Sequence, residues 1–260
     1  MSISLCIIVK NEERSLERCL RSVLNVVDEF IIVDTGSTDQ TLDIVDRLSG
    51  QPEFGSKIKL FHYEWCGDFA SARNYAVEHA RGDFILQLDA DEYLHPDDVE
   101  LIKPSLKKMC KDIRKVYFFY MKIINETIDG RLQTTPESIL RLWSNRSKIR
   151  YSRKCHESID DSLKLVSNKQ GFNINFRIMH DGYDTTLPSF VDKRKRNIAL
   201  LNEMIAEDPY DQLSLYYFAR DYSYFDKSKS INLLKRIEPL LDSPHKENAR
   251  ALIKEYSKQL

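Results

Sequence analysis

The stretch 82-GDFILQLDADEYL-94 decides the fold of this chain. Its apolar, β-favouring run from Phe84 to Leu88 ends abruptly in Asp89-Ala90-Asp91-Glu92. A buried strand that ends in carboxylates places negative charge at the carboxyl edge of a sheet, which is where ligands bind in open α/β folds. Two Asp residues separated by one residue can both reach one divalent cation, because Mg²⁺ and Mn²⁺ prefer carboxylate and phosphate oxygens. Such a cation would let this acidic turn hold an anionic diphosphate.

Taken alone, the same D-x-D pattern also fits a solvated acidic turn that leads into a helix near His95-Pro96. The sequence before it favours the ligand edge, because apolar runs alternate there with amphipathic segments. The pattern predicts strands at 3–9, 29–33, 57–62 and 84–88, and helices at 12–26, 41–48 and 68–80. Asn11 can cap the first helix, and Ser37 or Thr38 the second. This alternation implies right-handed crossovers and a mainly parallel, doubly wound sheet.

The rest of the chain changes character twice. The residues from 115 to 180 are rich in β-favouring side chains, with strands predicted at 115–124, 138–143 and 171–180 and a hairpin-type turn at Asp129-Gly130. From Pro188 onward four amphipathic helices are predicted, at 190–205, 212–225, 230–241 and 246–259. Their aromatic and leucine pattern resembles tetratricopeptide packing.

Composition excludes several classes of protein. The formal net charge is -1, from 39 basic and 40 acidic residues, which gives no electrostatic case for a nucleic-acid partner. The five Cys are odd in number and include no C-x-x-C pair, so a reducing compartment is the simplest assumption. No signal peptide or transmembrane segment is recognised, so we expect a cytoplasmic protein.

Three stretches resemble one known family: 3-ISLCIIVKNEERSLERCLRSV-23, 29-EFIIVDTGSTDQTLDIV-45 and 61-FHYEWCGDFASARNYAVEHARGDFILQLDADE-92. In this order they resemble the family 2 glycosyltransferases of the GT-A fold. The resemblance continues more sparsely through residues 154–157 and 180–183. Among subgroups, the chain is similar to bacterial transferases with a C-terminal tetratricopeptide-like segment. These include the peptide S-glycosyltransferases that modify a bacteriocin cysteine (the sublancin type), and the lipopolysaccharide-core glucosyltransferases are similar.

The resemblance implies an α/β, Rossmann-like nucleotide-sugar fold with a mainly parallel central sheet and a short helical segment at its C-terminal end. We expect a glycosyltransferase domain at 1–186, with a nucleotide-binding half at 1–95 and an acceptor half at 96–186. The helical segment would then occupy 187–260. It could hold a peptide, form a homodimer, or only buttress the sheet.

The resemblance also implies a set of donor-binding residues: Ile8, Val9, Asn11, Glu12, Asp34, Asp68, Arg73, Gln87, Asp89, Ala90 and Asp91. In the family, the loop after the first strand lines the uridine and ribose, although Glu12 also fits a helix-dipole acid. Asp34 would accept the N3 proton of uracil, and its alternative is to cap the turn that follows it. Arg73 suits a diphosphate, the orientation of Asp89, or a surface salt bridge.

The cofactor implied by the resemblance is a single divalent cation, Mn²⁺ or Mg²⁺. Asp91 is the expected direct ligand, and Asp89 would contact the ribose or the metal. His180 is the last residue of a predicted strand, and a late His completes the metal shell in many GT-A enzymes. A plain turn histidine is the alternative. The cation would assist departure of the nucleoside diphosphate as a Lewis acid.

An inverting transfer also needs a base near the acceptor, and His156-Glu157 is the candidate pair. Glu157 could deprotonate a hydroxyl, or His156 a thiol. Alternatively, the pair only braces the acceptor loop. Cys155 is interpreted as a bystander thiol, because an inverting reaction needs no covalent intermediate.

The function expected is transfer of a hexose, of the glucose or N-acetylglucosamine type, from a UDP-sugar to an acceptor. The acceptor could be a Cys or Ser of a bacteriocin-like peptide, or a glycolipid or lipopolysaccharide core. A sugar nucleotidyltransferase is disfavoured, because the loop after the first strand, KNEER, lacks the expected Gly. A catalytically inactive module that binds carbohydrate or protein is the alternative from another class.

Overall fold

The protein is described from a computed structural model, which covers residues 1–126, 132–146, 148–181 and 188–259. The chain forms two compact units. The strands of the first unit are β1 (Ile3–Val9), β2 (Glu29–Asp34), β3 (Ile58–His62), β4 (Phe84–Gln87), β5 (Glu92–Leu94), β6 (Val116–Glu126), β7 (Leu132–Ser144) and β8 (Lys169–His180). Its helices are α1 (Leu16–Ser22), α2 (Thr41–Ser49), η1 (Gly55–Lys57), α3 (Phe69–His79), α4 (Pro96–Met109) and α5 (Asp160–Lys164).

The eight strands of this described part form one sheet in the order β3-β2-β1-β4-β7-β6-β8-β5. The first four pair in parallel, as the alternation of strands and helices predicts. Beyond β4 the sheet is mixed, because β7 is antiparallel to β4 and β6, and β5 is antiparallel to β8. The α/β prediction is confirmed. The short strand β5 is not predicted, since its acidic sequence forms a strand only through pairing with β8.

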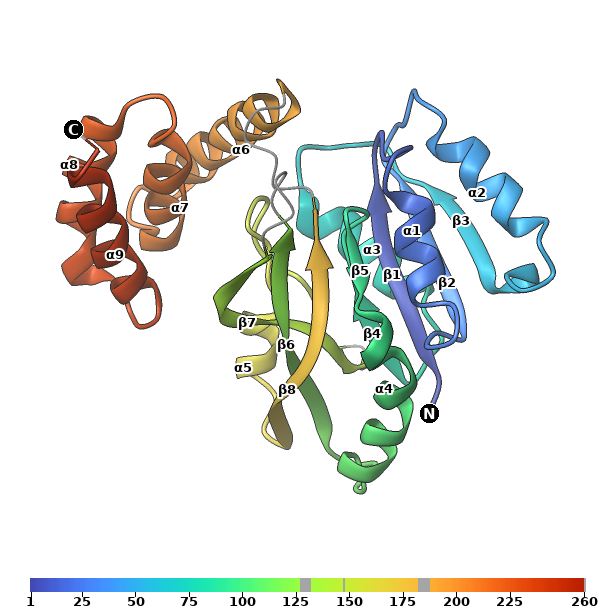
Figure 1. The fold of residues 1–260 in the computed structure, drawn as a ribbon. Helices are drawn as coiled ribbons and strands as arrows, with labels where there is room; N and C mark the ends of the chain where they lie inside the picture. Colours follow the sequence, from blue (N-terminus) through green and yellow to red (C-terminus); the bar gives the residue numbers. More distant parts are fainter. Residues whose placement is uncertain (127–131, 147, 182–187, 260) are drawn as a thin grey trace. The chain divides into compact units, whose positions relative to one another are not determined.

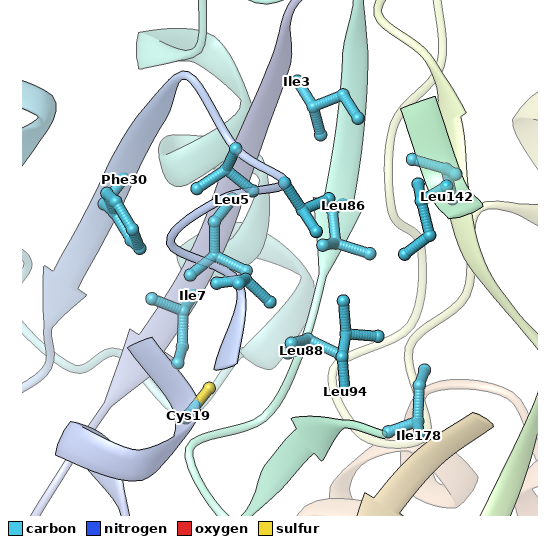
Figure 2. Packing of buried hydrophobic residues seen from close by; sticks show 14 of the residues in the cluster. Ile3, Leu5, Ile7, Cys19, Phe30, Leu86, Leu88, Leu94, Leu142 and Ile178 are labelled. Atoms are coloured by element: carbon cyan, nitrogen blue, oxygen red, sulfur yellow. The ribbon is translucent and has the colours of Figure 1, made fainter. Parts of the chain in front are cut away.

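Helices cover both faces of the sheet (Figure 1). Alternation along β1 explains this, because successive side chains of a strand point to opposite faces. Ile3, Leu5 and Ile7 join the core that includes residues of α1, α2 and α4. Figure 2 shows them with Phe30 of β2 and Leu86 of β4. On the other face, residues of β1, β2 and β4 pack with α3 and α5.

The loops at the start of α1 and α2 differ from the predicted caps. α1 begins at Leu16, and Asn11 does not cap it but has a φ of 58°. Asn tolerates this left-handed region better than most residues. Ser37 and Thr38 do not cap α2 either, since Asp39 Oδ1 accepts from the first backbone N–H of that helix at 3.0 Å.

The second unit contains α6 (Pro188–Glu207), α7 (Gln212–Tyr222), α8 (Lys227–Ile237), η2 (Glu238–Leu240) and α9 (His245–Ser257), together with Lys154–His156. Helices α6 to α9 lie where the sequence predicts them, but most of their first and last residues differ from the predicted ones. They share a core of their own, to which Tyr216, Ala219 and Leu234 contribute. Tyr216 is therefore a core side chain. Tetratricopeptide similarity and a homodimer through these helices stay predictions.

Two predictions concern residues outside the described part of the chain. The turn at Asp129-Gly130 lies there, and so does the predicted domain boundary between residues 186 and 187. In the described part, no helix is both long and apolar enough to pass through a bilayer. The cytoplasmic location stays a prediction.

Replacing Gly82 by Ala should lower the free energy of unfolding. A Cβ at Gly82 would lie 2.7 Å from the backbone nitrogen of Ser4 and 3.0 Å from the carbonyl carbon of Ile3. Admitting it requires β1 to move, which costs about 1–3 kcal/mol. Gly50→Ala is the matched control, since its Cβ would meet no atom closer than 3.6 Å. Urea denaturation measures both variants, and equal unfolding free energies would contradict the steric explanation.

Candidate functional site

The predicted donor residues cluster at the carboxyl ends of β1, β2 and β4, which are neighbours in the sheet. The parallel register places Val9 beside Asp34. Because parallel strands end at the same edge, the loops that follow them share this edge with the acidic turn after β4. The topology therefore brings together segments that are far apart in sequence.

The loops after β1 and β2 are held to each other by hydrogen bonds. Ser37 Oγ accepts from the backbone N–H of Asn11 at 3.1 Å, and Asn11 Oδ1 accepts from the backbone N–H of Thr38 at 2.7 Å. The backbone N–H of Glu12 donates to Thr41 Oγ1 at 2.7 Å. The side chain of Asn11 therefore joins the two loops, and its predicted donor contact would come from the backbone.

Asp34 is buried at the end of β2, and its carboxylate accepts from the turn that follows. Gly36 N–H and Ser37 N–H donate to it at 3.1 and 3.0 Å. Gly36 adopts a φ of 102°, which favours glycine. The turn-capping alternative for Asp34 thus matches the structure, and contact with uracil stays a prediction.

Asp89 lies between two arginines. Arg73 Nη2 is 2.7 Å from Asp89 Oδ1, and Arg141 Nη2 is 3.2 Å from Asp89 Oδ2. Gln87 Nε2 donates to Asp89 Oδ1 at 3.1 Å. Desolvation acts to raise the pKa of Asp89, but the two guanidinium groups outweigh it and hold the pKa well below its ordinary value. Asp89 is therefore a fixed anion, and the structure favours the orienting role among the three predicted for Arg73.

Arg141 and Glu92 form a buried ion pair beneath the acidic turn. Arg141 Nη2 is 2.6 Å from Glu92 Oε1, and the guanidinium also donates to Gln87 Oε1. Glu92 Oε2 accepts from the backbone N–H of Asp89 at 2.9 Å. Burial raises the pKa of Glu92 to about 7, although Arg141 opposes this shift. Neither residue was predicted from the sequence. The available signal was a charged residue inside the apolar strand SILRLW.

Asp91 meets different partners from Asp89. His180 Nε2 is 3.5 Å from Asp91 Oδ2, because the pairing of β5 with β8 places His180 beside Glu92. Asn125 Oδ1 lies 2.8 Å from His180 Nδ1. Burial acts to lower the pKa of His180, but hydrogen bonding to Asp91 and the nearby carboxylates raise it above its ordinary value. Two of the three predicted metal ligands are thus adjacent.

The structure separates the two candidate bases. Glu157 belongs to the first unit, where its Oε1 is 2.5 Å from Arg73 Nε. His156 belongs to the helical unit. Its Nε2 is 3.5 Å from Asp221 Oδ2, and its ring stacks on Tyr217 at a centroid distance of 4.0 Å. Glu157 shares Arg73 with Asp89, whereas His156 is engaged in helical packing.

The other predicted donor residues have local structural partners. Asp68 caps α3, since it accepts from the N–H of Ser71 at 3.0 Å. Ala90 and Val9 are buried in the core. Ile8 packs against the core on the opposite face. Any contact of these apolar residues with a donor would therefore use the backbone.

Arg141→Met should strongly destabilise the protein. It removes the guanidinium that contacts Gln87, Asp89 and Glu92, and each buried acceptor left without a donor costs about 1–3 kcal/mol. Arg146→Met is the control, because Arg146 follows the same strand but is exposed, and its loss should change the unfolding free energy by less than about 0.5 kcal/mol. Thermal and urea denaturation measure both variants. If the two were equally stable, Arg141 would not be the cation that compensates the acidic turn.

Comparison with known proteins gives relatives over much of the chain. A TPR repeat-containing protein of Synechococcus elongatus is 38% identical over 168 residues, which are 65% of this chain and 38% of that protein. The SPbeta prophage-derived glycosyltransferase SunS of Bacillus subtilis is 29% identical over 241 residues, which are 90% of this chain and 53% of SunS. The chain thus spans about half the length, or less, of these curated relatives.

Among solved structures, S. aureus TarS 1-349 matches with a TM-score of 0.53 and 17% identity, over 98% of this chain and 89% of that one. The same TarS fragment has also been solved in complex with UDP-GlcNAc. At this identity the likeness shows a GT-A-like fold alone. A family model described as Glycosyl transferase family 2 matches residues 4–162, more than half of the chain. The family resemblance is confirmed, and the chain belongs to glycosyl transferase family 2.

Proposed function

We propose that this protein transfers a hexose from a UDP-sugar to an acceptor, with inversion at the anomeric carbon and with the aid of a divalent cation. One observation carries the proposal: Arg73 binds both Asp89, beside the donor edge, and Glu157, the candidate base. Family 2 membership and a TarS fold neighbour solved with UDP-GlcNAc support a UDP-sugar donor. The transferred hexose is of the glucose or the N-acetylglucosamine type, and either of these two sugars fits the proposal.

The residues at the acidic turn fit a cation of the Mg²⁺ or Mn²⁺ type. The described residues contain no group of three His, Cys, Asp or Glu side chains that could hold a metal. Asp91 and His180 nevertheless supply one carboxylate oxygen and one imidazole nitrogen side by side. A cation of this class is commonly held by one or two protein ligands and by substrate phosphates. When bound, it would neutralise charge on the departing diphosphate.

Glu157 is the base that this arrangement favours. Arg73 holds one of its oxygens, and the carboxylate takes the proton of the acceptor hydroxyl or thiol as the nucleophile attacks the anomeric carbon. The bond from that carbon to the diphosphate oxygen breaks, and UDP leaves with the bonding electrons. The sugar carbon therefore inverts without a covalent enzyme intermediate. His156, stacked on Tyr217 in the helical unit, has a bracing role.

For the acceptor, we propose a Cys or Ser of a bacteriocin-like peptide. The sequence motifs resemble peptide S-glycosyltransferases, and the similarity to SunS covers 90% of this chain and so reaches into the helical segment. A screen of UDP-glucose and UDP-N-acetylglucosamine against Cys- and Ser-containing peptides and glycolipids tests this acceptor. Transfer only to a glycolipid or lipopolysaccharide core would replace the peptide by that alternative. Absence of both UDP binding and transfer would favour a catalytically inactive binding module.

Asp91→Asn should remove the cation-dependent part of UDP binding. The wild-type protein should be stabilised by UDP with Mn²⁺, by about 2.7 kcal/mol at a hundredfold excess over Kd. The variant loses a carboxylate ligand, so adding Mn²⁺ should give little stabilisation beyond that of UDP alone. Thermal denaturation with and without each ligand measures the effect.

Asp46→Asn is the matched control for this measurement, because Asp46 is an exposed carboxylate on α2. It should keep the full Mn²⁺-dependent stabilisation. An Asp91→Asn protein that responds to UDP and Mn²⁺ like the wild type would remove Asp91 from the metal site.

Glu157→Gln should lower kcat by about 10²- to 10⁴-fold, the usual contribution of a general base. Its amide oxygen still accepts from Arg73, so UDP binding should be retained. His156→Gln should cost far less, because His156 packs against Asp221 and Tyr217. Steady-state transfer rates and UDP titrations check both variants. The opposite order of effects would assign the base to His156.

A further inference from the structure

Asn74, next to Arg73 on α3, holds the backbone of a distant segment. Its Nδ2 donates to the carbonyl oxygen of Tyr151 at 3.0 Å, and its Oδ1 accepts from the backbone N–H of Tyr151 at 2.8 Å. One side chain thus satisfies both backbone groups of a single residue, 77 positions away. Such a pair fixes a segment in position and orientation, as a neighbouring strand would.

The segment that starts at Tyr151 leads to Glu157 and is closed by a backbone pair. Ser152 N–H donates to the Ser158 carbonyl at 2.9 Å, and Ser158 N–H donates to the Ser152 carbonyl at 3.2 Å. Glu157 lies in the loop closed by this pair, immediately before Ser158, so its backbone is held through Ser152 and Tyr151. The backbone that carries the candidate base is therefore anchored to α3.

The carboxylate of Glu157 is anchored to the same helix. Arg73 Nε is 2.5 Å from Glu157 Oε1, and the guanidinium carbon lies 5.8 Å from the ring centroid of Tyr151. Arg73 is itself buried, and its Nη2 also lies 2.7 Å from Asp89 Oδ1. The contacts form a closed ring, from Asn74 through Tyr151 and Glu157 to Arg73, within the first unit.

We propose that Asn74 is a positioning residue for the transfer reaction, which acts by holding the backbone of Glu157 while Arg73 holds its carboxylate. The inference rests on the proposed role of Glu157 as base. The oxygen of a base must lie within about 2.6–3.2 Å of the heavy atom whose proton it removes. A displacement of about 1 Å, caused by a change away from the reacting atoms, can cost about 10²-fold in rate.

The test compares Asn74→Ala with Asn145→Ala. Asn145 is also half-buried, but its Nδ2 donates to the carbonyls of Ala80 and Gly82 at 3.2 and 3.0 Å, and neither of these partners belongs to the segment 151–158. Both variants should lose similar stability. The reaction measured is release of UDP from a UDP-sugar. Only Asn74→Ala should lower its kcat, by about 10- to 100-fold. The KM for the UDP-sugar should stay within about twofold of the wild-type value. A kcat within about twofold of that of Asn145→Ala overturns the proposal.

Amide hydrogen exchange gives a second readout that needs no acceptor. Peptides covering residues 150–158 should exchange faster in Asn74→Ala than in the wild type or Asn145→Ala, because the backbone anchor is lost. Unchanged exchange there overturns the proposal as well. A wild-type protein that neither binds UDP nor releases it from a UDP-sugar overturns the proposed function instead, and the exchange measurement still decides whether Asn74 anchors this segment.

Discussion

The acidic turn depends on the compensation of carboxylates by two buried guanidinium groups. Asp89 follows β4 and is partly exposed, whereas Glu92 begins β5 and is buried, so Glu92 in particular would be costly to bury as an isolated anion. Arg141 contacts both, and Arg73 contacts Asp89. The two arginines come from β7 and α3. Arg141 reaches the carboxyl edge of the first four strands only because β7, from the second half of the sheet, pairs with β4.

This compensation gives the two aspartates of the D-x-D motif different roles. One oxygen of Asp89 is paired with Arg73 and the other with Arg141, so its charge is compensated by ion pairs within the protein. Asp91 lies beside His180 instead, because β5 starts immediately after the turn and pairs with β8. A polar pair at the carboxyl edge of a sheet suits a cation that also binds phosphate oxygens. We infer that Asp91, rather than Asp89, is the aspartate of the motif that suits a ligand.

The sequence was sufficient to predict what depends on local patterns. Alternating apolar runs gave the four parallel strands and their helices, and the quoted motifs gave the family. Long-range pairing could not be predicted from the sequence. The partner of Arg141 and the existence of β5 depend on contacts between segments about fifty or more residues apart. The cap predicted at Asn11 failed for the same reason, since its side chain bonds to Thr38 on the next loop. Residue types were thus easier to predict than their partners.

His156 and Glu157 illustrate this limit most directly. Adjacent in sequence, they were equivalent candidates for the base, yet one joins the helical unit and the other joins Arg73. Asp91, His180, Arg73 and Glu157, to which the proposed reaction gives roles, all belong to the first unit.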